Sequence, residues 1–501
     1  MTITRRGFLA GTAASTALLA CGRAPLVKTR VPTITHGVQV GDVGGGSAIV
    51  WARSSEPARM IVEVSGSASY RNPRTFAGPV VGPDTDHTGA VTVAGLEPGQ
   101  TIAYRVKFER EADRGASAWT TGTFATPHSD NVRFVWTGDT CGQGYGRNPE
   151  WGGLRGYAAM RAVEPAFFLH SGDLFYADNP ILSEHETLGG RIWKNVTNER
   201  VARVAQELDD FRARLAYNLE DDHVRALAAE VPIIAQWDDH ETRNNWWPGQ
   251  TLTDERYTIE RDADKLAALA LRAVREWMPI AGPSVHRVIH YGPLVDVIVV
   301  DLRTWRTPND ANTGDSGAML GAAQADWLVE QLATSKARWK IVACDQPIAL
   351  VIGDGPSDRM HEGYANGAPG APLGREKELA RVLAAIKARG VQNVVWLTAD
   401  VHYAAHHAFD PARATGADFT PFHELVAGPI HAGTFGPNPL DPTFGPELKF
   451  QWAPPVGTGN LAPWDGLQSF GVVDATDAAL RVALVGIDGR ERYTVEIPAL
   501  R

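Results

Sequence analysis

Cysteine is scarce in this sequence: only Cys21, Cys141 and Cys344 occur among 501 residues. Three cysteines are too few for the disulfide framework that holds small secreted domains together. The hydrophobic content of 44% and the charged content of 21% are ordinary for a globular chain. A chain of this length and composition can bury a sizeable core, and we expect two or more domains.

Clustered positive charge is also missing. The formal net charge is -10, and the Lys and Arg residues are scattered along the chain. Nucleic acids and anionic membrane surfaces select for basic clusters, so we expect no nucleic-acid-binding surface. No apolar run of about 18 residues follows the N-terminal segment, so no transmembrane helix is expected.

The segment 1–22, "MTITRRGFLAGTAASTALLACG", has the features of an export signal. It combines Arg5 and Arg6 with a mild apolar stretch and a small-residue cleavage region. The pair of arginines is typical of the twin-arginine pathway, whose export machinery would be a partner. We expect a periplasmic or secreted protein. Cys21 could carry a lipid, and the sequence leaves this open.

Two regions with different patterns follow the signal. Residues 31–127 contain short strands with period-two alternation, as in "TIAYRVKF", which predicts a small all-β sandwich of fibronectin or immunoglobulin type. From 128 to 501, strands alternate with helical stretches, which predicts an α/β catalytic domain. Helical patterns cover 197–219 and 374–390. Apolar strands are expected at 132–137, 166–170, 231–236, 294–300, 340–344 and 393–399.

Every one of these six strands is followed by an aspartate. The strands lead into "GDTC", "SGDLFYAD", "WDDHE", "DLRTWR", "DQP" and "ADVHYAAHH". One such Asp is usually a helix cap or a turn residue. Six of them at the carboxyl ends of strands would repel one another unless cations neutralise them. The pattern therefore predicts a metal centre.

The donor types favour more than one metal ion. Carboxylate oxygens could come from Asp139, Asp173, Asp239 and Asp400, a phenolate from Tyr176, a thiolate from Cys141 and an imidazole from His402. This set is too large for one ion and suits two or more, with one Asp as a bridge. Cys344 lies inside an apolar run and is expected to be an inert buried thiol.

The motifs in this order resemble a known pattern. "GD", "GDLFY", "DHE" and "DVH" follow the order of the metallophosphoesterases, and the departures "WDDHE" and "ADVH" are similar to the PhoD-like alkaline phosphatase family. The resemblance covers nearly the whole chain. It implies mixed sheets flanked by helices and a metal-dependent hydrolase acting on a phosphate mono- or diester, with Fe(3+) and Ca(2+) as cofactors.

The resemblance also implies ligand sets. The first metal would take Asp139, Cys141, Asp173, Tyr176 and His402. The second would share Asp173 and add Asp239 and Asp400. The doubled Asp leaves open whether Asp238 or Asp239 is the ligand, and Gln346 is a weak further candidate beside a strand-end hydrogen bond.

Further residues are candidates for contacts with the substrate. His240 is expected as proton donor, with a core histidine held by Glu241 as the alternative. Arg303, together with Arg306, would bind phosphate through a bidentate fork, or an Asp301–Arg303 ion pair would merely brace the loop. Arg243 and Asn244 are substrate-side candidates.

Two rival functions stay open at this point. One is a phosphodiesterase or phospholipase D-like hydrolase acting on lipid or polymer head groups with the same metals. The other is a non-catalytic phosphate-binding surface lipoprotein, which the completeness of the ligand set disfavours.

Overall fold

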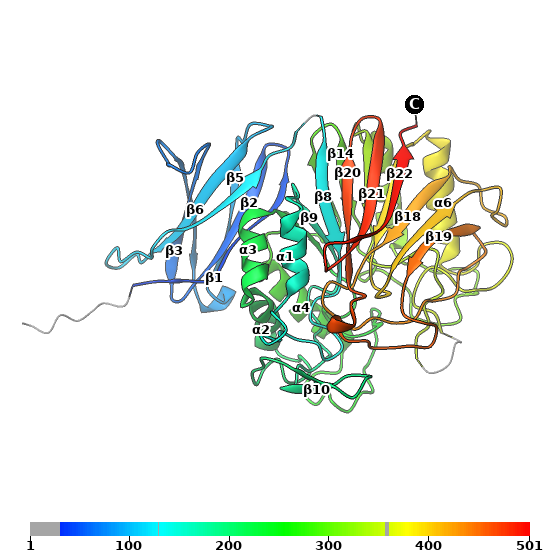
Figure 1. Ribbon diagram of the computed structural model, residues 1–501, viewed down its shortest axis with the longest axis horizontal. Coiled ribbons are helices and arrows are strands. Elements are labelled where there is room, and N and C mark those ends of the chain that lie inside the picture. The colour runs from blue at the N-terminus through cyan, green and yellow to red at the C-terminus, as the bar shows by residue number, and fades with distance from the viewer. Residues whose placement is uncertain (1–30, 129, 356–359, 501) are drawn as a thin grey trace, which may run out of the picture.

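The computed structural model describes residues 31–128, 130–355 and 360–500 (Figure 1). The predicted export signal at 1–22 and the question of a lipid on Cys21 lie outside these residues. Within the described ranges, no helix combines the length and the apolar character needed to cross a bilayer.

The N-terminal region is built from strands, which are divided between two sheets. Its strands β4, β3, β6 and β7 form a four-stranded sheet, whereas β1, β2 and β5 belong to a nine-stranded sheet. In β6 the side chains of Ile102, Tyr104, Val106 and Phe108 are buried, as the alternation indicates. The elements are β1 (Ile34–Gly44), β2 (Ser47–Ser54), β3 (Ala58–Ser65), β4 (Arg74–Val81), η1 (Pro83–Thr85), β5 (Thr88–Ala94), β6 (Thr101–Glu109) and β7 (Thr120–Ala125).

The nine-stranded sheet links this region to the rest of the chain. Its order is β22-β21-β20-β8-β9-β12-β1-β2-β5, and β1 runs parallel to β12 with Gly41 beside Ile233. The strands β8, β9 and β12 are mutually parallel, so their carboxyl ends meet at one edge. The remaining strands are β8 (Val132–Thr137), β9 (Phe168–Ser171), β12 (Ile233–Gln236), β20 (Ser469–Ala475), β21 (Ala479–Gly486) and β22 (Glu491–Pro498).

A seven-stranded sheet forms the second half of the catalytic region. Its order is β13-β14-β15-β16-β18-β17-β19, and β14, β15, β16 and β18 are parallel. All six strands expected from the sequence are present in the two sheets. The members of this sheet are β13 (Arg287–Tyr291), β14 (Val295–Val299), β15 (Trp339–Ala343), β16 (Val394–Thr398), β17 (Ala404–Phe409), β18 (Phe422–Val426) and β19 (Pro446–Trp452).

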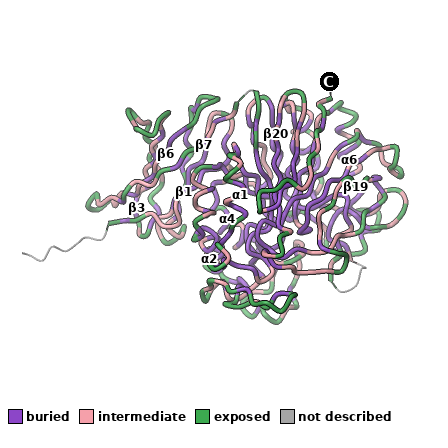
Figure 2. The backbone as a smooth tube through the Cα atoms, viewed as in Figure 1, coloured by how far each residue is buried: buried purple, intermediate pink, exposed green. Residues whose placement is uncertain are grey.

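The two large sheets pack face to face, with helices on their outer faces. Phe134 and Leu169 of one sheet share a buried core with Val297 and Ile341 of the other. Figure 2 shows this buried interior as purple strands through the middle of the molecule. One outer face packs against α1–α4 and the other against α5 and α6. The helices are α1 (Arg155–Ala162), α2 (Leu208–Leu219), α3 (Asp222–Glu230), α4 (Ala263–Trp277), α5 (Gly321–Thr334) and α6 (Glu376–Ala388).

One predicted helix is shorter than the sequence suggested. The pattern over 197–219 yields helix only from Leu208 onward, because Glu207 and Asp210 form a capping box that starts the helix there. Asp210 also accepts hydrogen bonds from Arg200 at 2.9 Å and Arg203 at 2.7 Å, which holds the preceding turns outside the helix. Short elements complete the fold: the hairpin β10 (Glu184–Glu186) and β11 (Ile192–Lys194), and η2 (Pro463–Asp465).

Candidate metal centre and active site

Left-handed backbone conformations mark the loops that follow the parallel strands. Asp139 after β8 has φ 70°, Asp173 after β9 has φ 49°, and Asp400 and His402 after β16 have φ 65° and 62°. Non-glycine residues adopt such angles only where the surrounding structure imposes them, and these cluster at functional sites. The strand ends therefore turn sharply and hold these side chains in fixed directions.

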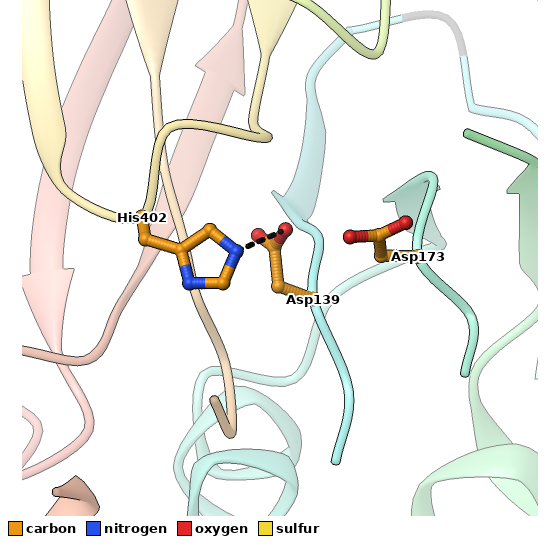
Figure 3. A group of neighbouring side chains, drawn as sticks. All are labelled: Asp139, Asp173 and His402. Carbon is orange, nitrogen blue, oxygen red and sulfur yellow. Dashed lines mark ion pairs between the residues drawn. The ribbon is translucent and has the colours of Figure 1, made fainter. Parts of the chain in front are cut away.

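The first group of donor atoms comprises Asp139, Asp173 and His402 (Figure 3). The His402 Nε2 atom lies 3.3 Å from Asp139 Oδ1 and 2.9 Å from the Tyr176 hydroxyl. The Tyr176 hydroxyl in turn lies 3.4 Å from Asp139 Oδ1. His402 Nδ1 is hydrogen-bonded to the Gly433 carbonyl, which fixes the ring and leaves Nε2 facing the carboxylates.

The second group shares a residue with the first. Asp173 and Asp239 lie together with His240, and Asp239 also lies together with Asp238 and Asp400. Within each of these groups the donor atoms are within 4.8 Å of one another. Asp173 therefore connects two neighbouring positions where cations could bind.

Buried oxygen atoms without partners show that this cluster fits cations. Asp139 Oδ2, Asp238 Oδ2 and Asp239 Oδ1 are buried and make no hydrogen bond within the described part of the chain. Such atoms are costly to bury unless something positive compensates them. A Cβ atom at Gly428 would lie 2.6 Å from Asp139 Oδ2, so glycine there keeps the space beside that oxygen open.

The raised pKa values of the buried carboxyl groups also indicate that this cluster suits cations. Burial raises the pKa of Asp173 well above its usual range, and the carboxylates of Asp239 and Asp238 raise it further. Burial likewise raises the pKa of Asp400, and the nearby carboxylates of Asp238 and Glu362 raise it further. Bound cations would remove this penalty and keep the carboxylates ionised.

His240 is held by a residue that the sequence reasoning did not single out. Its Nδ1 atom lies 2.7 Å from Asp178 Oδ1, and both side chains are buried. Burial lowers the pKa of His240, but the carboxylates of Asp178 and Asp239 outweigh it and raise the pKa from 6.5 to about 9. Glu241, the partner considered in the alternative, instead accepts the backbone N–H groups of Leu174 and Asp238. The sequence could have indicated this partner, because Asp178 is the last residue of the motif "GDLFYAD".

Cys141 is not placed with the metal donors, contrary to the expectation of a thiolate ligand. Its side chain belongs to the apolar core with Leu154 and Tyr157, and its thiol is not part of any donor group found among the described residues. Its backbone N–H donates to the His431 carbonyl at 2.7 Å. Its φ of 64° is left-handed, so the chain turns sharply just after Asp139. Burial raises the pKa of the thiol.

Arg303 also differs from its predicted role. The side chain is fully buried, its Nε donates to Asp238 Oδ1 at 2.6 Å, and its Nη1 pairs with Glu362. Towards Asp301 only the backbone N–H of Arg303 donates, at 3.0 Å. The structure therefore shows neither an accessible phosphate fork nor a guanidinium bracing Asp301, because acidic residues distant in sequence take up the charge. Arg306 is likewise buried, against Asn309 and Glu362.

The remaining candidates divide between the cavity and the core. Asn244 is exposed at the cavity and donates its N–H to Asp178 Oδ2 at 3.0 Å, whereas Arg243 is not among the lining residues. Gln346 is fully buried, and both of its side-chain polar atoms lack partners among the described residues. Asp239 and Asp400 line the cavity and Asp238 does not, which favours Asp239 as the ligand that faces the cavity.

A cavity of about 330 Å³ opens above the two donor groups. Asp173, Asp239, Asp400 and His402 are among the residues that line it. Glu362, which no motif in the sequence indicated, reaches it as well. The lining consists of Gln143, Asp173, Asp239, His240, Asn244, Asn245, Ile352, Gly353, Gly355, Glu362, Asp400, Val401, His402, Phe435, Gly436 and Asn438.

The fold consists of two packed sheets with helices on their outer faces, and its cation donors lie at the strand ends. The model of the PhoD-like phosphatase family matches residues 134–478, and that of its N-terminal domain matches residues 20–128. The chain therefore belongs to the PhoD-like phosphatase family.

Known proteins resemble the chain in sequence and in fold. Alkaline phosphatase D of Bacillus subtilis (strain 168) is 27% identical over 397 residues, which cover 74% of this chain and 64% of that protein. The match thus spans less than two thirds of the relative's length. A solved structure of PhoD has a TM-score of 0.67 at 21% identity, covering 92% of this chain and 88% of that one. The purple acid phosphatase PPD1 from yellow lupin (Lupinus luteus) seeds has a TM-score of 0.57 at 13% identity, covering 93% and 74%.

Proposed function

We propose that this protein is a metal-dependent phosphatase that hydrolyses phosphate esters at the cavity above Asp173. The observation that carries the proposal is the shared position of Asp173 between two groups of buried cation donors. Membership of the PhoD-like phosphatase family supports the same reaction.

The donor sets differ in a way that suits two different cations. Asp139, Asp173, Tyr176 and His402 would hold the first, and the negative charge of two carboxylates and a phenolate favours ferric iron. Asp173, Asp239 and Asp400 would hold the second through oxygen atoms, since Asp239 shares one donor group with Asp173 and another with Asp400, and oxygen ligation favours calcium. When bound, two such cations lower the pKa of a water molecule and neutralise charge on the phosphate.

The chain's own residues complete the chemistry. His240 is fixed through Nδ1 by Asp178, so its other ring nitrogen can hold a proton for the leaving oxygen. Asn244 lies at the cavity and is available to the substrate. Ile352, Val401 and Phe435 provide an apolar wall, which suits the organic group of an ester.

Turnover of a chromogenic monoester and a chromogenic diester tests the proposal. We expect hydrolysis that a chelator abolishes and that added iron and calcium restore. Turnover unaffected by complete metal removal would refute it. The ratio of the two rates separates a monoesterase from a phosphodiesterase, and binding of phosphate without turnover would identify the non-catalytic alternative.

We further propose that residues 1–22 direct export through the twin-arginine pathway and that 31–127 and 128–501 are the two domains of the mature protein. Replacing both Arg5 and Arg6 with Lys is expected to leave the protein in the cytoplasm, as cell fractionation would show. Mass spectrometry of the mature N-terminus determines whether Cys21 carries a lipid.

A further inference from the structure

A second cavity lies at one end of the N-terminal four-stranded sheet. It has a volume of about 270 Å³, and the segments 64–66, 71–74 and 95–102 supply its lining. None of these residues lines the cavity above Asp173. The strands β3 and β6, which border it, lie at the opposite end of the molecule from β19 and α6 (Figure 1). This N-terminal cavity is therefore separate from the candidate metal centre.

Two arginines that line the N-terminal cavity keep their positive charge available. Neither Arg71 nor Arg74 forms an ion pair with a carboxylate in the described ranges. On the same sheet, by contrast, Arg59 pairs with Glu111 at 2.6 Å. The acidic residue of the lining, Glu97, also makes no ion pair within the described part of the chain. The cavity thus carries net positive charge in a chain whose formal net charge is -10.

Arg74 is held in place by the chain itself. Its Nη1 donates to the Gly95 carbonyl and its Nη2 to the Ala94 carbonyl, each at 2.9 Å. These neutral oxygens occupy two of the five guanidinium N–H donors and leave the charge uncancelled. Gly95 has a φ of 70°, and a Cβ atom there would lie 3.0 Å from Arg74 Nη1, so glycine permits the close approach. A guanidinium fixed in advance lowers the entropic cost of binding an anion.

Arg71 is the less constrained of the two. Its side chain is exposed and makes no hydrogen bond or ion pair within the described ranges, so the fold does not require it. It stands in the turn between β3 and β4, next to Tyr70, whose hydroxyl donates to the Tyr104 carbonyl of β6 at 2.7 Å. This hydrogen bond ties the turn to the sheet and keeps Arg71 at the cavity.

We propose that the N-terminal cavity binds a phosphate group through Arg71 and Arg74, either free phosphate or a phosphate of a polymer. The forked N–H donors of arginine match the oxygen atoms of phosphate, and a tetrahedral anion can accept from two guanidinium groups at once. The buried side chains of Val64, Leu96 and Ile102 line the same cavity, and an apolar wall strengthens the attraction between opposite charges. The inference does not depend on the proposed hydrolysis.

Equilibrium dialysis of the metal-loaded full chain with inorganic phosphate tests the inference. Phosphate is expected to bind at the metal centre and at the N-terminal cavity. Arg71→Gln should weaken the second of these binding events about tenfold or more, because charge-assisted hydrogen bonds are lost. Asp173→Asn should remove the first and leave the second. Phosphate binding that Arg71→Gln leaves unchanged would overturn the proposal. If no phosphate binds at the metal centre, the proposed function is weakened while the dependence on Arg71 still decides this inference.

Two further variants separate a built site from general surface charge. Arg59 lies on the same sheet but is already paired with Glu111, so Arg59→Gln is the matched control and should leave phosphate binding unchanged. A loss in Arg59→Gln equal to that in Arg71→Gln would contradict the proposal. Glu97→Gln removes the negative charge from the lining and should tighten phosphate binding. Weaker or unchanged binding in Glu97→Gln would count against a phosphate at this position.

Chemical modification locates the bound phosphate without any substitution. Phosphate should protect Arg71 from phenylglyoxal, as mass spectrometry of the peptides would show. Arg114 is exposed and does not line the cavity, so its modification should not change. Equal modification of Arg71 with and without phosphate would contradict the proposal.

A linear polyphosphate distinguishes the two sources of the phosphate group. It is measured in Asp173→Asn, in which we expect it to stay intact. Binding that requires Arg71 and is tighter than that of inorganic phosphate identifies a polymer as the ligand, and equal affinity identifies free phosphate. Both results support the site. Polyphosphate binding that is insensitive to Arg71→Gln would overturn it.

Discussion

The pair formed by His240 and Asp178 gives the most specific prediction about the reaction. If His240 protonates the leaving oxygen, its loss must matter most for esters whose leaving group is a poor one. A general acid contributes about 10²- to 10⁴-fold to the rate. We therefore expect His240→Gln to slow hydrolysis of an alkyl phosphate by that range and of a nitrophenyl phosphate by much less.

The size of the Asp178 effect follows from its geometry. A buried charge-assisted hydrogen bond such as that of 2.7 Å between Asp178 and His240 contributes about 1.5–3 kcal/mol. Because about 1.4 kcal/mol corresponds to a factor of ten, Asp178→Asn should lower turnover by roughly 10- to 100-fold.

The pH dependence has a defined sign. The pKa of His240 is raised to about 9, so the ring carries its proton below that pH and loses it above. Proton donation therefore disappears as the pH rises through about 9. Asp178→Asn removes a carboxylate that raises this pKa, so the alkaline limb of the rate profile should move to lower pH.

A buried histidine–carboxylate pair elsewhere provides the control. His407 Nδ1 lies 2.8 Å from Glu424 Oε2, both side chains are fully buried, and neither belongs to a donor group found among the described residues. His407→Gln should lower stability and leave the dependence on the leaving group unchanged. An equal loss for both esters in His240→Gln would refute proton donation by His240.

Three further variants test the assignment of the donors. Cys141→Ser places a hydroxyl in an apolar core, so we expect the free energy of unfolding to fall by about 1–3 kcal/mol while the iron content stays unchanged. A loss of iron from the folded variant would show that the thiol is a ligand. Asp400→Asn should weaken calcium binding in a titration while iron is retained, and a parallel loss of both would contradict separate positions. Tyr176→Phe should abolish a phenolate absorption band of the iron-loaded protein, whereas an unchanged spectrum would exclude Tyr176 as a ligand.

The strands and their terminal aspartates could be predicted because both are local features. Apolar runs fix the strands, and each parallel strand carries its aspartate to the carboxyl end of its sheet. Asp139 and Asp173 follow neighbouring parallel strands of the nine-stranded sheet, and Asp400 follows a parallel strand of the seven-stranded sheet. The sequence could not predict that N-terminal strands join the nine-stranded sheet, because the pairing of Gly41 with Ile233 depends on tertiary packing.

The described geometry differs from the predicted site at Cys141 and Arg303 for related reasons. Spacing in the sequence placed Cys141 near Asp139, but the direction of a side chain depends on φ, and residues in the left-handed region can turn away from the site. The partners of Arg303, Asp238 and Glu362, lie 65 and 59 residues away, so nothing local indicated that its charge is already used. Asp178, in contrast, could have been predicted from local sequence, since it stands beside a recognised motif.

Asp173 provides the most direct test of the central claim that one shared carboxylate joins two cation positions. The measurement is the iron and calcium content of purified Asp173→Asn, determined together with its rate of ester hydrolysis. We predict that both metals are depleted together and that hydrolysis falls by orders of magnitude, because the shared ligand serves both positions. A folded Asp173→Asn protein that keeps both metals and its hydrolysis rate would contradict the account.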